Sequence, residues 1–483
     1  MDFQTLKTFP VLQRAYQISQ ELGTSIYLVG GAVRDILMGF FDGKDFDFVL
    51  GERWQEAALL FAQKARGTVI PWDFNQIRIA VRENGKTVSV DFAGFRGEDL
   101  TSDLRARDFT INSIALCVES LFKEENPELY DPLRGFIHLQ QKVVQADGEA
   151  TFDHDPLRIL RAIRFSRAFN FCIEDATKCS MQKKARLLSE VAQERVKREL
   201  FAIFHLPGAD RAIRELIELG IMQPLIPELG QFPAIQQGPP HQYDLLQHSL
   251  KTVECLVSMI EHPERTGKKY AAAIPEHLHE YIEDGVITRR ALLICAGLLH
   301  DSGKLSTQTI EGERIRFLRH EQEGLNINQH IARRLLLGKR AQRIIAIITG
   351  NHMRIHQLAA LQDISERAVR RFLHDTQEAP LEVLLLALAD VQATSSGELY
   401  RDVKDRVEQL VGKIMETLFS SSADRPYMPL ITGHDIMEIM NFAPGKAVGT
   451  ILREIHDGER TGMFNSREEV IEWLKKKKQS ALS

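Results

Sequence analysis

The chain has few cysteines, no long hydrophobic run and no large excess of either charge. Its five cysteines include no CxxC pair and their number is odd, which argues against a zinc ribbon and against a disulfide-stapled secreted fold. The longest apolar stretches, such as 291–299 and 383–389, are too short to cross a bilayer. The first 20 residues lack the basic flank and apolar block of a signal peptide. We therefore expect a cytoplasmic protein with no membrane partner.

The small net charge limits the partners that the chain is expected to have. With 61 basic and 66 acidic residues the net charge is −5, which argues against a protein that coats nucleic acid nonspecifically, and we expect no DNA partner. Between Asp155 and Arg211, however, twelve lysines and arginines stand against seven acidic residues. Phosphate contacts depend on local charge, so this stretch can offer RNA a basic face. On charge alone, a solvated pair of salt-bridged helices is the simpler interpretation.

Length and periodicity indicate several domains. At roughly 100–200 residues per domain, the 483 residues predict two to four of them. Residues 1–150 mix short β-rich runs with helical patterns, and Glu83-Asn84-Gly85 between two of these runs is a hairpin signal. From Asp155 onward the periodicity is almost entirely helical. The sequence thus predicts a small head of strands and helices followed by a long helical body.

The most informative pattern in the head is a strand, a Gly-Gly turn, a helix and a second strand with two acids. Gly30 and Gly31 end a β-rich run and open a helix, so their backbone N–H groups can point at a phosphate, which the helix dipole favours. Arg34, one turn into that helix, can reach the same phosphates. Asp45 and Asp47 are spaced i and i+2 on the next strand, so their carboxylates share one face. Such a pair can hold two divalent cations for an in-line displacement at phosphorus.

A third acid lies on another expected strand. Asp91 stands in the run 88–92, beyond the hairpin signal. Each of these features is weak by itself, because a DxD is usually a solvated strand end and a Gly-Gly pair is usually only a turn. In this order, and with a third acid on a strand, they indicate the palm of a nucleotidyltransferase.

The segment 28–49 resembles that of the class II tRNA nucleotidyltransferases and bacterial poly(A) polymerases, and the resemblance extends over the whole chain. It implies an α+β fold, in which a polymerase-β-like head with a mixed sheet and helices precedes an all-α neck, an HD domain and a helical tail. In the family the two aspartates of this segment bind the catalytic Mg²⁺ ions, which implies that role for Asp45 and Asp47. The family's strand acid before a TFR-like end matches Asp91 before residues 93–96, so we expect Asp91 to be catalytic as well.

A further motif matches the part of the family that binds the incoming nucleotide. It spans residues 105–115 and reads RARDFTINSIA. In relatives the corresponding Arg, Asp and Asn contact the sugar and the phosphates. The resemblance therefore implies these roles for Arg107, Asp108 and Asn112.

The segment 155–161 looks like the protein template with which the family selects a base. Asp155 and Arg158 are spaced i and i+3, which makes them neighbours on a helix, and a carboxylate beside a guanidinium matches the Watson–Crick edge of a base. Arg161 belongs to the same motif and is expected to bind the nucleotide. An isolated DxxR is usually an ion pair at a helix N-terminus, but its place after the other motifs favours the template. The family usually has Glu immediately before this Asp, whereas this chain has His154, which leaves open the base that is chosen.

The helical body contains a second group of residues that suits a metal. The dipeptide His-Asp occurs five times, but only His300-Asp301 ends a strongly apolar run and precedes Ser-Gly-Lys, and polar groups at a buried wall need a reason. Imidazole and carboxylate ligands suit Mn²⁺, Ni²⁺, Zn²⁺ or Mg²⁺. The pattern is similar to that of the HD-superfamily phosphohydrolases, whose full set corresponds here to His248, His300, Asp301, His320, His352 and Asp390. This resemblance implies a phosphatase or phosphodiesterase activity, and the alternative is a decayed domain that is kept for RNA binding.

Three other residues belong to the surroundings of this expected metal site. We expect His356 to lie behind the ligands or at the surface rather than to bind the metal. We expect His241 and Asp244 to line the mouth of the same site.

The motifs divide the chain into four expected domains. These are a nucleotidyltransferase head at 1–150, a neck with the base-selecting motif and an RNA-binding surface at 151–228, an HD-type phosphohydrolase domain at 229–400, and a helical tail at 401–483.

The leading hypothesis is a template-independent enzyme that adds CCA, or part of it, to the 3′ end of tRNA. The 3′-hydroxyl attacks the α-phosphate of CTP or ATP and pyrophosphate leaves, with Mg²⁺ held by Asp45 and Asp47. The chain lacks the long basic extension that bacterial poly(A) polymerases often carry, which favours tRNA as the substrate. The alternatives are a poly(A) polymerase, an enzyme that adds only CC or only A, an HD phosphohydrolase whose head merely binds RNA, and a pure RNA-binding scaffold.

Overall fold

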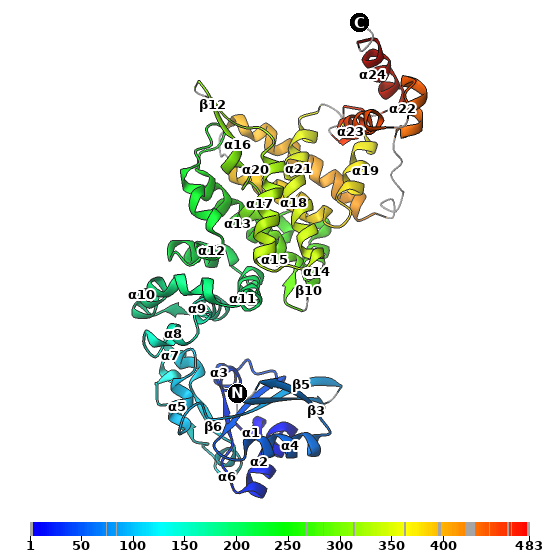
Figure 1. Cartoon of the computed structure of the whole chain (residues 1–483). Coiled ribbons are helices and arrows are strands. Elements are labelled where there is room, and N and C mark those ends of the chain that lie inside the picture. The colour runs from blue at the N-terminus through cyan, green and yellow to red at the C-terminus, as the bar shows by residue number, and fades with distance from the viewer. Residues whose placement is uncertain are drawn as a thin grey trace. The chain divides into compact units, whose positions relative to one another are not determined.

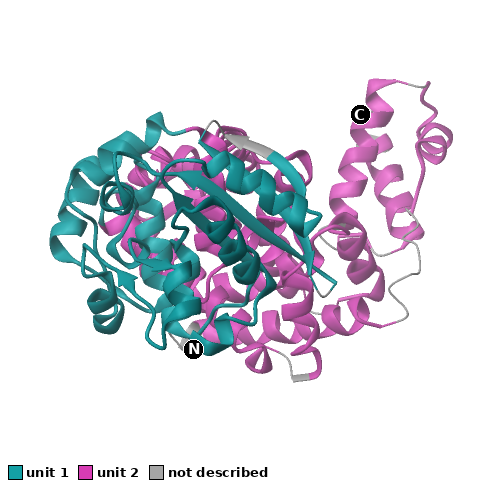
Figure 2. Cartoon of the chain, turned by 90° about the horizontal axis from the view of Figure 1, so that it is seen from below, with its two compact units in different colours: residues 1–191, 219–221 teal, residues 192–218, 222–483 magenta. Residues whose placement is uncertain are grey.

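The computed structural model describes residues 3–73, 75–83, 85–266, 268–283, 285–312, 314–361, 364–394, 398–420, 430–443, 445–460, 463–464 and 466–480. The chain divides into two compact units, which have different colours in Figure 2. Unit 1 comprises residues 1–191 and 219–221, and unit 2 comprises residues 192–218 and 222–483.

A seven-stranded mixed sheet forms the centre of unit 1 (Figure 1). Its strands lie in the order β3-β4-β5-β2-β1-β6-β7. Their bounds are β1 (Tyr27–Val29), β2 (Asp45–Leu50), β3 (Thr68–Asp73), β4 (Gln76–Glu83), β5 (Lys86–Gly94), β6 (Ala115–Cys117) and β7 (Leu129–Tyr130). β2 and β5 are parallel, and the other neighbours are antiparallel. The β4–β5 pairing confirms the expected hairpin, of whose turn Asn84 lies outside the described residues.

The alternation of side chains along β2 separates the core from the acids. Phe46 is buried and turns into the core, whereas Asp45 and Asp47 on either side of it face the opposite way. On the core side Phe92 of β5 meets Phe61 of helix α4 (Trp54–Ala65) with 5.3 Å between the ring centroids. The apolar residues of β2 thus fix the face on which its two carboxylates stand.

The remainder of unit 1 is mostly helical. Helix α4 packs on β4 and β5, and α2 packs against α4 and α6. Two further strands, β8 (Val143–Val144) and β9 (Cys172–Ile173), form a short parallel pair. The helices of this unit are α1 (Phe3–Leu6), α2 (Pro10–Leu22), α3 (Gly31–Met38), α4 (Trp54–Ala65), α5 (Leu100–Arg105), η1 (Thr110–Asn112), α6 (Val118–Lys123), α7 (Gly135–Gln141), α8 (Ala150–His154), α9 (Arg158–Phe169), α10 (Asp175–Lys184) and η2 (Ala185–Glu190).

Unit 2 is a helical body in which α13, α15, α18 and α20 pack against one another (Figure 1). Its C-terminal helices α22, α23 and α24 enclose a separate apolar cluster. No helix among the described residues is both long enough and apolar enough to span a membrane. The helices of this unit are α11 (Gln193–His205), α12 (Ala209–Glu218), η3 (Pro227–Ala234), α13 (Leu245–Glu261), η4 (Pro263–Arg265), η5 (Lys268–Tyr270), α14 (Ala273–Leu278), α15 (Arg289–Leu299), α16 (Lys304–Thr307), α17 (His320–Arg334), α18 (Lys339–Ala359), α19 (Glu366–Asp375), α20 (Pro380–Thr394), α21 (Glu398–Leu418), α22 (Gly433–Met440), α23 (Lys446–Arg460) and α24 (Arg467–Ser480).

The expectation of an almost entirely helical body needs a correction. Strands β10 (Tyr281–Glu283) and β11 (Ile287–Thr288) pair, as do β12 (Gln308–Glu311) and β13 (Arg314–Phe317). The turns of these hairpins contain Gly285 and Gly312, both with positive φ, which favours a tight reversal of the chain. The strands are too short to give a clear alternating pattern in the sequence.

The buried position of Phe46 leads to a stability prediction. We expect Phe46→Ala to lower the free energy of unfolding of unit 1 by about 3–5 kcal/mol, because it opens a cavity under the strand that carries the acids. Phe40 is 70% exposed, so Phe40→Ala should change this free energy by less than about 0.5 kcal/mol. Urea unfolding followed by tryptophan fluorescence compares the two variants. Equal midpoints for both would contradict the assignment of Phe46 to the core.

Candidate functional site

The Gly-Gly turn at the end of β1 lies against a carboxylate and a guanidinium at the same time. Gly30 has φ 70° and ψ −139°, which residues with a Cβ rarely adopt. A Cβ on Gly30 would lie 3.0 Å from Nη1 of Arg107 and 3.3 Å from Oδ2 of Asp47. Gly31 is the first residue of α3, so the helix N-terminus opens at the same place. The structure therefore places the Gly-Gly turn, the carboxylate of Asp47 and the guanidinium of Arg107 next to one another.

Asp45 and Asp47 share one face of β2, as the sequence predicts. Burial raises the pKa of Asp47 to about 6, the charge of Arg107 opposes this rise, and Asp91 adds to it. Burial also raises the pKa of Asp45 above its ordinary value. A carboxyl group whose pKa is higher in the folded state destabilises the fold when it is ionised, so a nearby cation would offset this cost at neutral pH. Two such oxygen donors side by side suit a hard divalent cation.

The third acid, Asp91, lies beside Asp47 but is already bound by an arginine. β2 and β5 pair so that Asp47 is opposite Asp91, and β5 and β4 pair so that Asp91 is opposite Arg78. Nε and Nη2 of Arg78 donate to Oδ1 and Oδ2 of Asp91 at 2.8 and 2.7 Å. This bond raises the pKa of Arg78. The structure thus brings the three acids to one face of the sheet, with the guanidinium of Arg78 at the edge of the group.

Four of the expected nucleotide-binding residues form a chain of hydrogen bonds. Nη1 of Arg34 donates to Oδ1 of Asn112, and Nδ2 of Asn112 donates to Oδ1 of Asp108, both at 2.8 Å. Nε and Nη2 of Arg161 donate to Oδ2 of Asp108 at 2.9 and 2.7 Å. Burial works against ionisation of Asp108, but the charge of Arg161 and these bonds hold its pKa below the usual value. The chain connects α3, η1 and α9, so it fixes these three elements around the Gly-Gly turn.

Arg107 is held by an acid that the sequence analysis does not single out. Nε and Nη2 of Arg107 donate to Oδ2 of Asp103 at 3.1 and 2.9 Å, and Asp103 is fully buried. The remaining nitrogen, Nη1, is the one that lies near Gly30. The only sequence signal for Asp103 is an acid four residues before an arginine, which is common on helices.

The expectation that Asp155 and Arg158 lie on one helix is wrong. Asp155 has extended φ and ψ (−153° and 98°) and ends α8, while α9 begins at Arg158. Pro156 explains the break, because a residue before proline is pushed out of the α region. Nη2 and Nη1 of Arg158 donate to the backbone carbonyls of Ala106 and Arg107 at 2.7 and 3.1 Å. These carbonyls hold Arg158 against the segment that carries Asp108.

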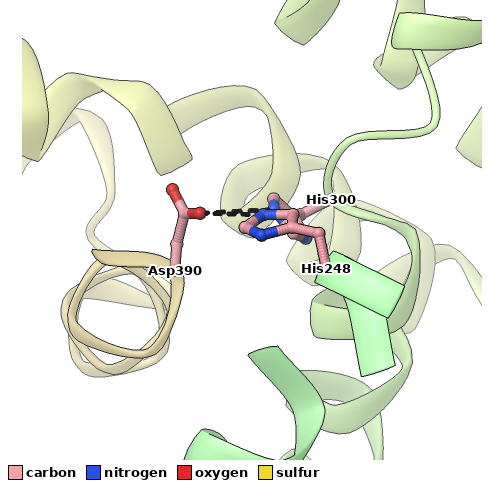
Figure 3. A group of neighbouring side chains, drawn as sticks. All are labelled: His248, His300 and Asp390. Atoms are coloured by element: carbon pink, nitrogen blue, oxygen red, sulfur yellow. Dashed lines mark ion pairs between the residues drawn. The ribbon is translucent and has the colours of Figure 1, made fainter. Parts of the chain in front are cut away.

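In unit 2 the six expected metal ligands are all buried and form two groups of three. The first group is His248 of α13, His300 at the end of α15 and Asp390 of α20. Figure 3 shows these three side chains pointing toward one another. Nε2 of His248 lies 3.1 Å and Nε2 of His300 lies 3.8 Å from Oδ1 of Asp390.

The second group is Asp301, His320 at the start of α17 and His352 of α18. Oδ1 of Asp301 lies 3.2 Å from Nε2 of His320 and 3.5 Å from Nε2 of His352. The other oxygen of Asp301, Oδ2, lies 3.2 Å from Nε2 of His300 in the first group. Asp301 therefore stands between the two groups and faces both of them.

Backbone carbonyls orient three of these histidines. Nδ1 of His300, His320 and His352 lies 2.9, 2.9 and 2.6 Å from the carbonyl oxygens of the residues three positions earlier. In a neutral ring whose Nδ1 donates to the carbonyl, Nε2 is unprotonated and can bind a metal at the centre, which is the usual arrangement of a metal-binding histidine. Gly303 brings α17 close, since a Cβ there would lie 1.9 Å from the carbonyl oxygen of His320.

The charges in this cluster favour a cation. Burial lowers the pKa of His300, but Asp301 and Asp390 reverse the effect and raise it to about 10. Lys304, also buried, places Nζ 2.6 Å from Oδ2 of Asp301 and donates to Oε1 of Gln237 at 2.7 Å. The buried carboxylates of Asp301 and Asp390 thus lie beside basic groups, and imidazole nitrogens point at the same place. This set of donors fits one or more divalent metal ions.

Two of the three expected neighbours lie beside candidate ligands and the third caps the helix that carries His248, and lining of the site's mouth by His241 and Asp244 stays a prediction. Nε2 of His356 lies 3.0 Å from Oδ2 of Asp390, so this histidine contacts a candidate ligand and belongs to neither group of three. The ring of His241 lies 5.0 Å from that of His248, and burial lowers the pKa of His241 to about 3. Asp244 caps α13 by accepting a hydrogen bond from the backbone N–H of Gln247 at 2.9 Å.

Two further site residues are found only in the structure. Arg78 lies opposite Asp91 because of the β4–β5 register. Pairing residues outward from the expected hairpin turn would have indicated this contact, but only if the register at the turn were assumed. Lys304 follows His300-Asp301 closely in sequence, but nothing in the sequence shows that its ammonium group contacts Asp301.

Three protein families match successive parts of the chain. The poly A polymerase head domain matches residues 26–145. The probable RNA and SrmB-binding site of polymerase A matches residues 170–232, and the HD domain matches residues 245–394. The order is the one that the motifs predict.

Whole-length relatives are tRNA nucleotidyltransferases. The A-adding tRNA nucleotidyltransferase of Deinococcus radiodurans is 31% identical over 459 residues, which cover 92% of this chain and 93% of that protein. The CC-adding tRNA nucleotidyltransferase of Geobacter sulfurreducens is 29% identical over 461 residues, which cover 94% and 92%. The solved structure of a Thermotoga maritima CCA-adding enzyme complexed with tRNA has the same fold, with a TM-score of 0.59, 20% identity and coverage of 100% and 97%. The α+β fold and the resemblance are confirmed, and the chain belongs to the tRNA nucleotidyltransferase family.

Proposed function

We propose that this protein builds all or part of the CCA end of tRNA from CTP and ATP. The observation that carries the proposal is the pair Asp45 and Asp47 on one face of β2, next to the Gly30 turn and Arg107. The names of the A-adding and CC-adding relatives supply the substrate class. The reaction forms a bond between the 3′-oxygen of the RNA and the α-phosphorus of the nucleotide, and pyrophosphate leaves.

Asp45 and Asp47 would hold Mg²⁺ in this reaction. Their oxygens are the donors that Mg²⁺ prefers. Burial raises the pKa of both groups, which means that their ionised forms are unfavourable here, and a bound cation would offset that cost. When bound, Mg²⁺ supplies a lower pKa for the attacking hydroxyl and neutralises charge on the triphosphate.

The residues around the turn would bind the triphosphate and the sugar. Gly30 lets the backbone approach closely, and the N-terminus of α3 at Gly31 favours an anion. Asp103 fixes the guanidinium of Arg107 with one nitrogen left to face the phosphates. Asp108 would accept a hydrogen bond from the sugar.

Two more of the expected nucleotide-binding residues act on neighbouring side chains. Arg34 and Arg161 are bound to Asn112 and Asp108, so they hold these side chains in place from α3 and α9. In this role each arginine orders a neighbour, and each still carries the positive charge that attracts a nucleotide.

Asp155 and Arg158 would read the base. Arg158 is anchored on the carbonyls of Ala106 and Arg107, which leaves its other N–H groups as donors in a fixed place. The carboxylate of Asp155 supplies acceptors three residues earlier. His154, where the family usually has Glu, is exposed and gives this chain a different neighbour for that carboxylate.

We assign the parts of the chain to steps of this function. Residues 1–150 carry the transfer chemistry, 151–228 the base-selecting segment and an RNA-binding surface, 229–400 the second metal site, and 401–483 a helical tail. Because tRNA and nucleoside triphosphates are found inside cells, we propose a cytoplasmic location.

We also propose that the buried cluster of unit 2 hydrolyses phosphoesters with a divalent metal. The supporting observation is the two groups of three ligands that share Asp301. The ligand types suit Mn²⁺, Ni²⁺, Zn²⁺ or Mg²⁺. The six ligands would hold the metal, and Lys304 beside Asp301 would bind an anionic substrate.

Substitution of the acid pair tests the transfer mechanism. We expect Asp45→Asn and Asp47→Asn each to lower nucleotide addition by at least about a hundredfold, because a bound metal ion stabilises the transition state by several kcal/mol. Asp42→Asn removes a nearby exposed acid and should leave addition within about twofold. Purified full-length protein, Mg²⁺ and labelled CTP or ATP are incubated with tRNA lacking CCA, tRNA ending in CC, and an unrelated RNA, and the products are sized on a gel.

The products of the same assay decide how many nucleotides are added. Addition of CCA confined to tRNA supports a complete CCA-adding enzyme. Addition of A only to CC-ended tRNA, or of C only, supports a partial enzyme, and long A tails on any RNA support a poly(A) polymerase. Unchanged addition by both acid variants would contradict the mechanism, and no addition by the wild type would leave only the hydrolase in unit 2.

Removal of the His300-Asp301 pair tests the second activity. We expect His300→Ala/Asp301→Ala to lose the metal of unit 2 and any hydrolysis of p-nitrophenyl phosphate or bis-p-nitrophenyl phosphate, while nucleotide addition stays within about twofold. Metal content is measured by mass spectrometry after incubation with Mn²⁺, Ni²⁺, Zn²⁺ or Mg²⁺. The control His456→Ala/Asp457→Ala removes another His-Asp pair of unit 2 and should keep both properties. Hydrolysis that survives in the first variant would contradict the proposed hydrolase.

A further inference from the structure

Arg78 belongs to the same cross-strand row as two of the acids. Asp47 on β2 is opposite Asp91 on β5, and Asp91 is opposite Arg78 on β4. Residues that are directly opposite on neighbouring strands point to the same face of the sheet. The face of Asp45 and Asp47 therefore ends, on the β4 side, in a positive charge.

The Arg78–Asp91 contact uses both oxygens of the carboxylate. Nε and Nη2 of Arg78 form two parallel bonds of 2.8 and 2.7 Å, the fork geometry that makes an arginine–carboxylate pair both strong and directional. The side chain of Asp91 is 9% exposed and that of Arg78 is 30% exposed. A pair so shielded from water is held more firmly than one at the surface.

Three carboxylates on one face would repel one another without this cation. Asp45 and Asp47 share one face of β2, Asp47 is opposite Asp91, and Asp91 is opposite Arg78, so the three acids and the arginine form one group. Arg78 donates two hydrogen bonds to Asp91, and its charge also acts on the other two acids of this face. If Asp91 were neutral, the nearest acids for Arg78 on this face would be the two that are expected to bind the metal.

We propose that Arg78 is a positioning residue for nucleotidyl transfer, which binds Asp91 so that Asp45 and Asp47 alone hold the cation. The inference rests on the proposed metal site. In this arrangement Asp91 is a partner that holds Arg78 away from the metal ligands, and Arg78 keeps Asp91 out of the coordination sphere. In the competing assignment Asp91 is a third metal ligand, and its ion pair with Arg78 only stabilises the hairpin.

The charges of the pair give the two assignments opposite consequences. Asp91→Asn removes the negative charge that Arg78 binds, so more of the positive charge of Arg78 acts on Asp45 and Asp47 and metal binding weakens. Arg78→Gln in the same chain removes that charge and restores metal binding. If Asp91 were a metal ligand, Arg78→Gln would not replace the carboxylate oxygen lost in Asp91→Asn, and metal binding would stay weak.

Binding of Mn²⁺ to the full-length chain, measured by electron paramagnetic resonance of the free ion with ATP present and RNA absent, separates these assignments. The double variant Asp45→Asn/Asp47→Asn shows how many ions belong to unit 1, since the cluster of unit 2 is unchanged in it. We expect Asp91→Asn to weaken Mn²⁺ binding at this site by about tenfold, which corresponds to about 1.4 kcal/mol. We expect Asp91→Asn/Arg78→Gln to return to within about threefold of the wild type.

Single removal of the arginine provides an independent test. We expect Arg78→Gln to bind Mn²⁺ about threefold or more tightly, because Asp91 is then free to face the ion, and this test holds even if Asp91→Asn does not fold. Arg82→Gln removes the same charge from an exposed position four residues along β4 and should leave the affinity unchanged.

The outcomes distinguish failure of the inference from failure of the metal site. A double variant that remains as weak as Asp91→Asn, or an Arg78→Gln variant with unchanged affinity, overturns the role of Arg78 while the metal site stands. Equal Mn²⁺ binding by the wild type and by Asp45→Asn/Asp47→Asn overturns both.

Discussion

The structure depends on carboxylates that are gathered where their charge is unfavourable. In unit 1 burial raises the pKa of Asp47 to about 6, and two more acids stand on the same face of the sheet. In unit 2 the buried Asp301 and Asp390 lie among five histidines and a lysine. A fold keeps such groups only if positive charge compensates them. In both sites a basic side chain is bound directly to an acid, Arg78 to Asp91 in unit 1 and Lys304 to Asp301 in unit 2.

The surrounding elements serve to hold these charges in position. The parallel register of β2 and β5 sets Asp47 beside Asp91, and the buried Phe46 determines which face the acids occupy. Arginines are then fixed by acids rather than left free, as Asp103 fixes Arg107. Where side chains are bound in advance, less ordering is needed when a nucleotide arrives. The same principle applies in unit 2, where carbonyls fix the imidazole rings before a metal is bound.

Most of the fold and of the candidate sites could be predicted from the sequence, and the exceptions have a common cause. Spacing along one strand placed Asp45 and Asp47 on one face, and an apolar run ending in His300-Asp301 indicated a buried metal site. Contacts between different strands were harder to predict. Arg78 and Asp91 meet because of the β4–β5 register, which the sequence alone does not determine. Local backbone geometry also misled, since Pro156 breaks the helix that was expected to join Asp155 and Arg158. The two small hairpins of unit 2 were missed because their strands are too short for a clear alternation.

The central claim is that Asp45 and Asp47 bind the catalytic cation while Asp91 remains bound to Arg78. Anomalous diffraction from crystals of the full-length protein grown with Mn²⁺ and ATP tests it most directly. We expect an anomalous peak within about 2.5 Å of oxygens of Asp45 and Asp47, with the Arg78–Asp91 pair intact beside it. A map without a peak there, or with a carboxylate oxygen of Asp91 coordinating the ion, would contradict the claim.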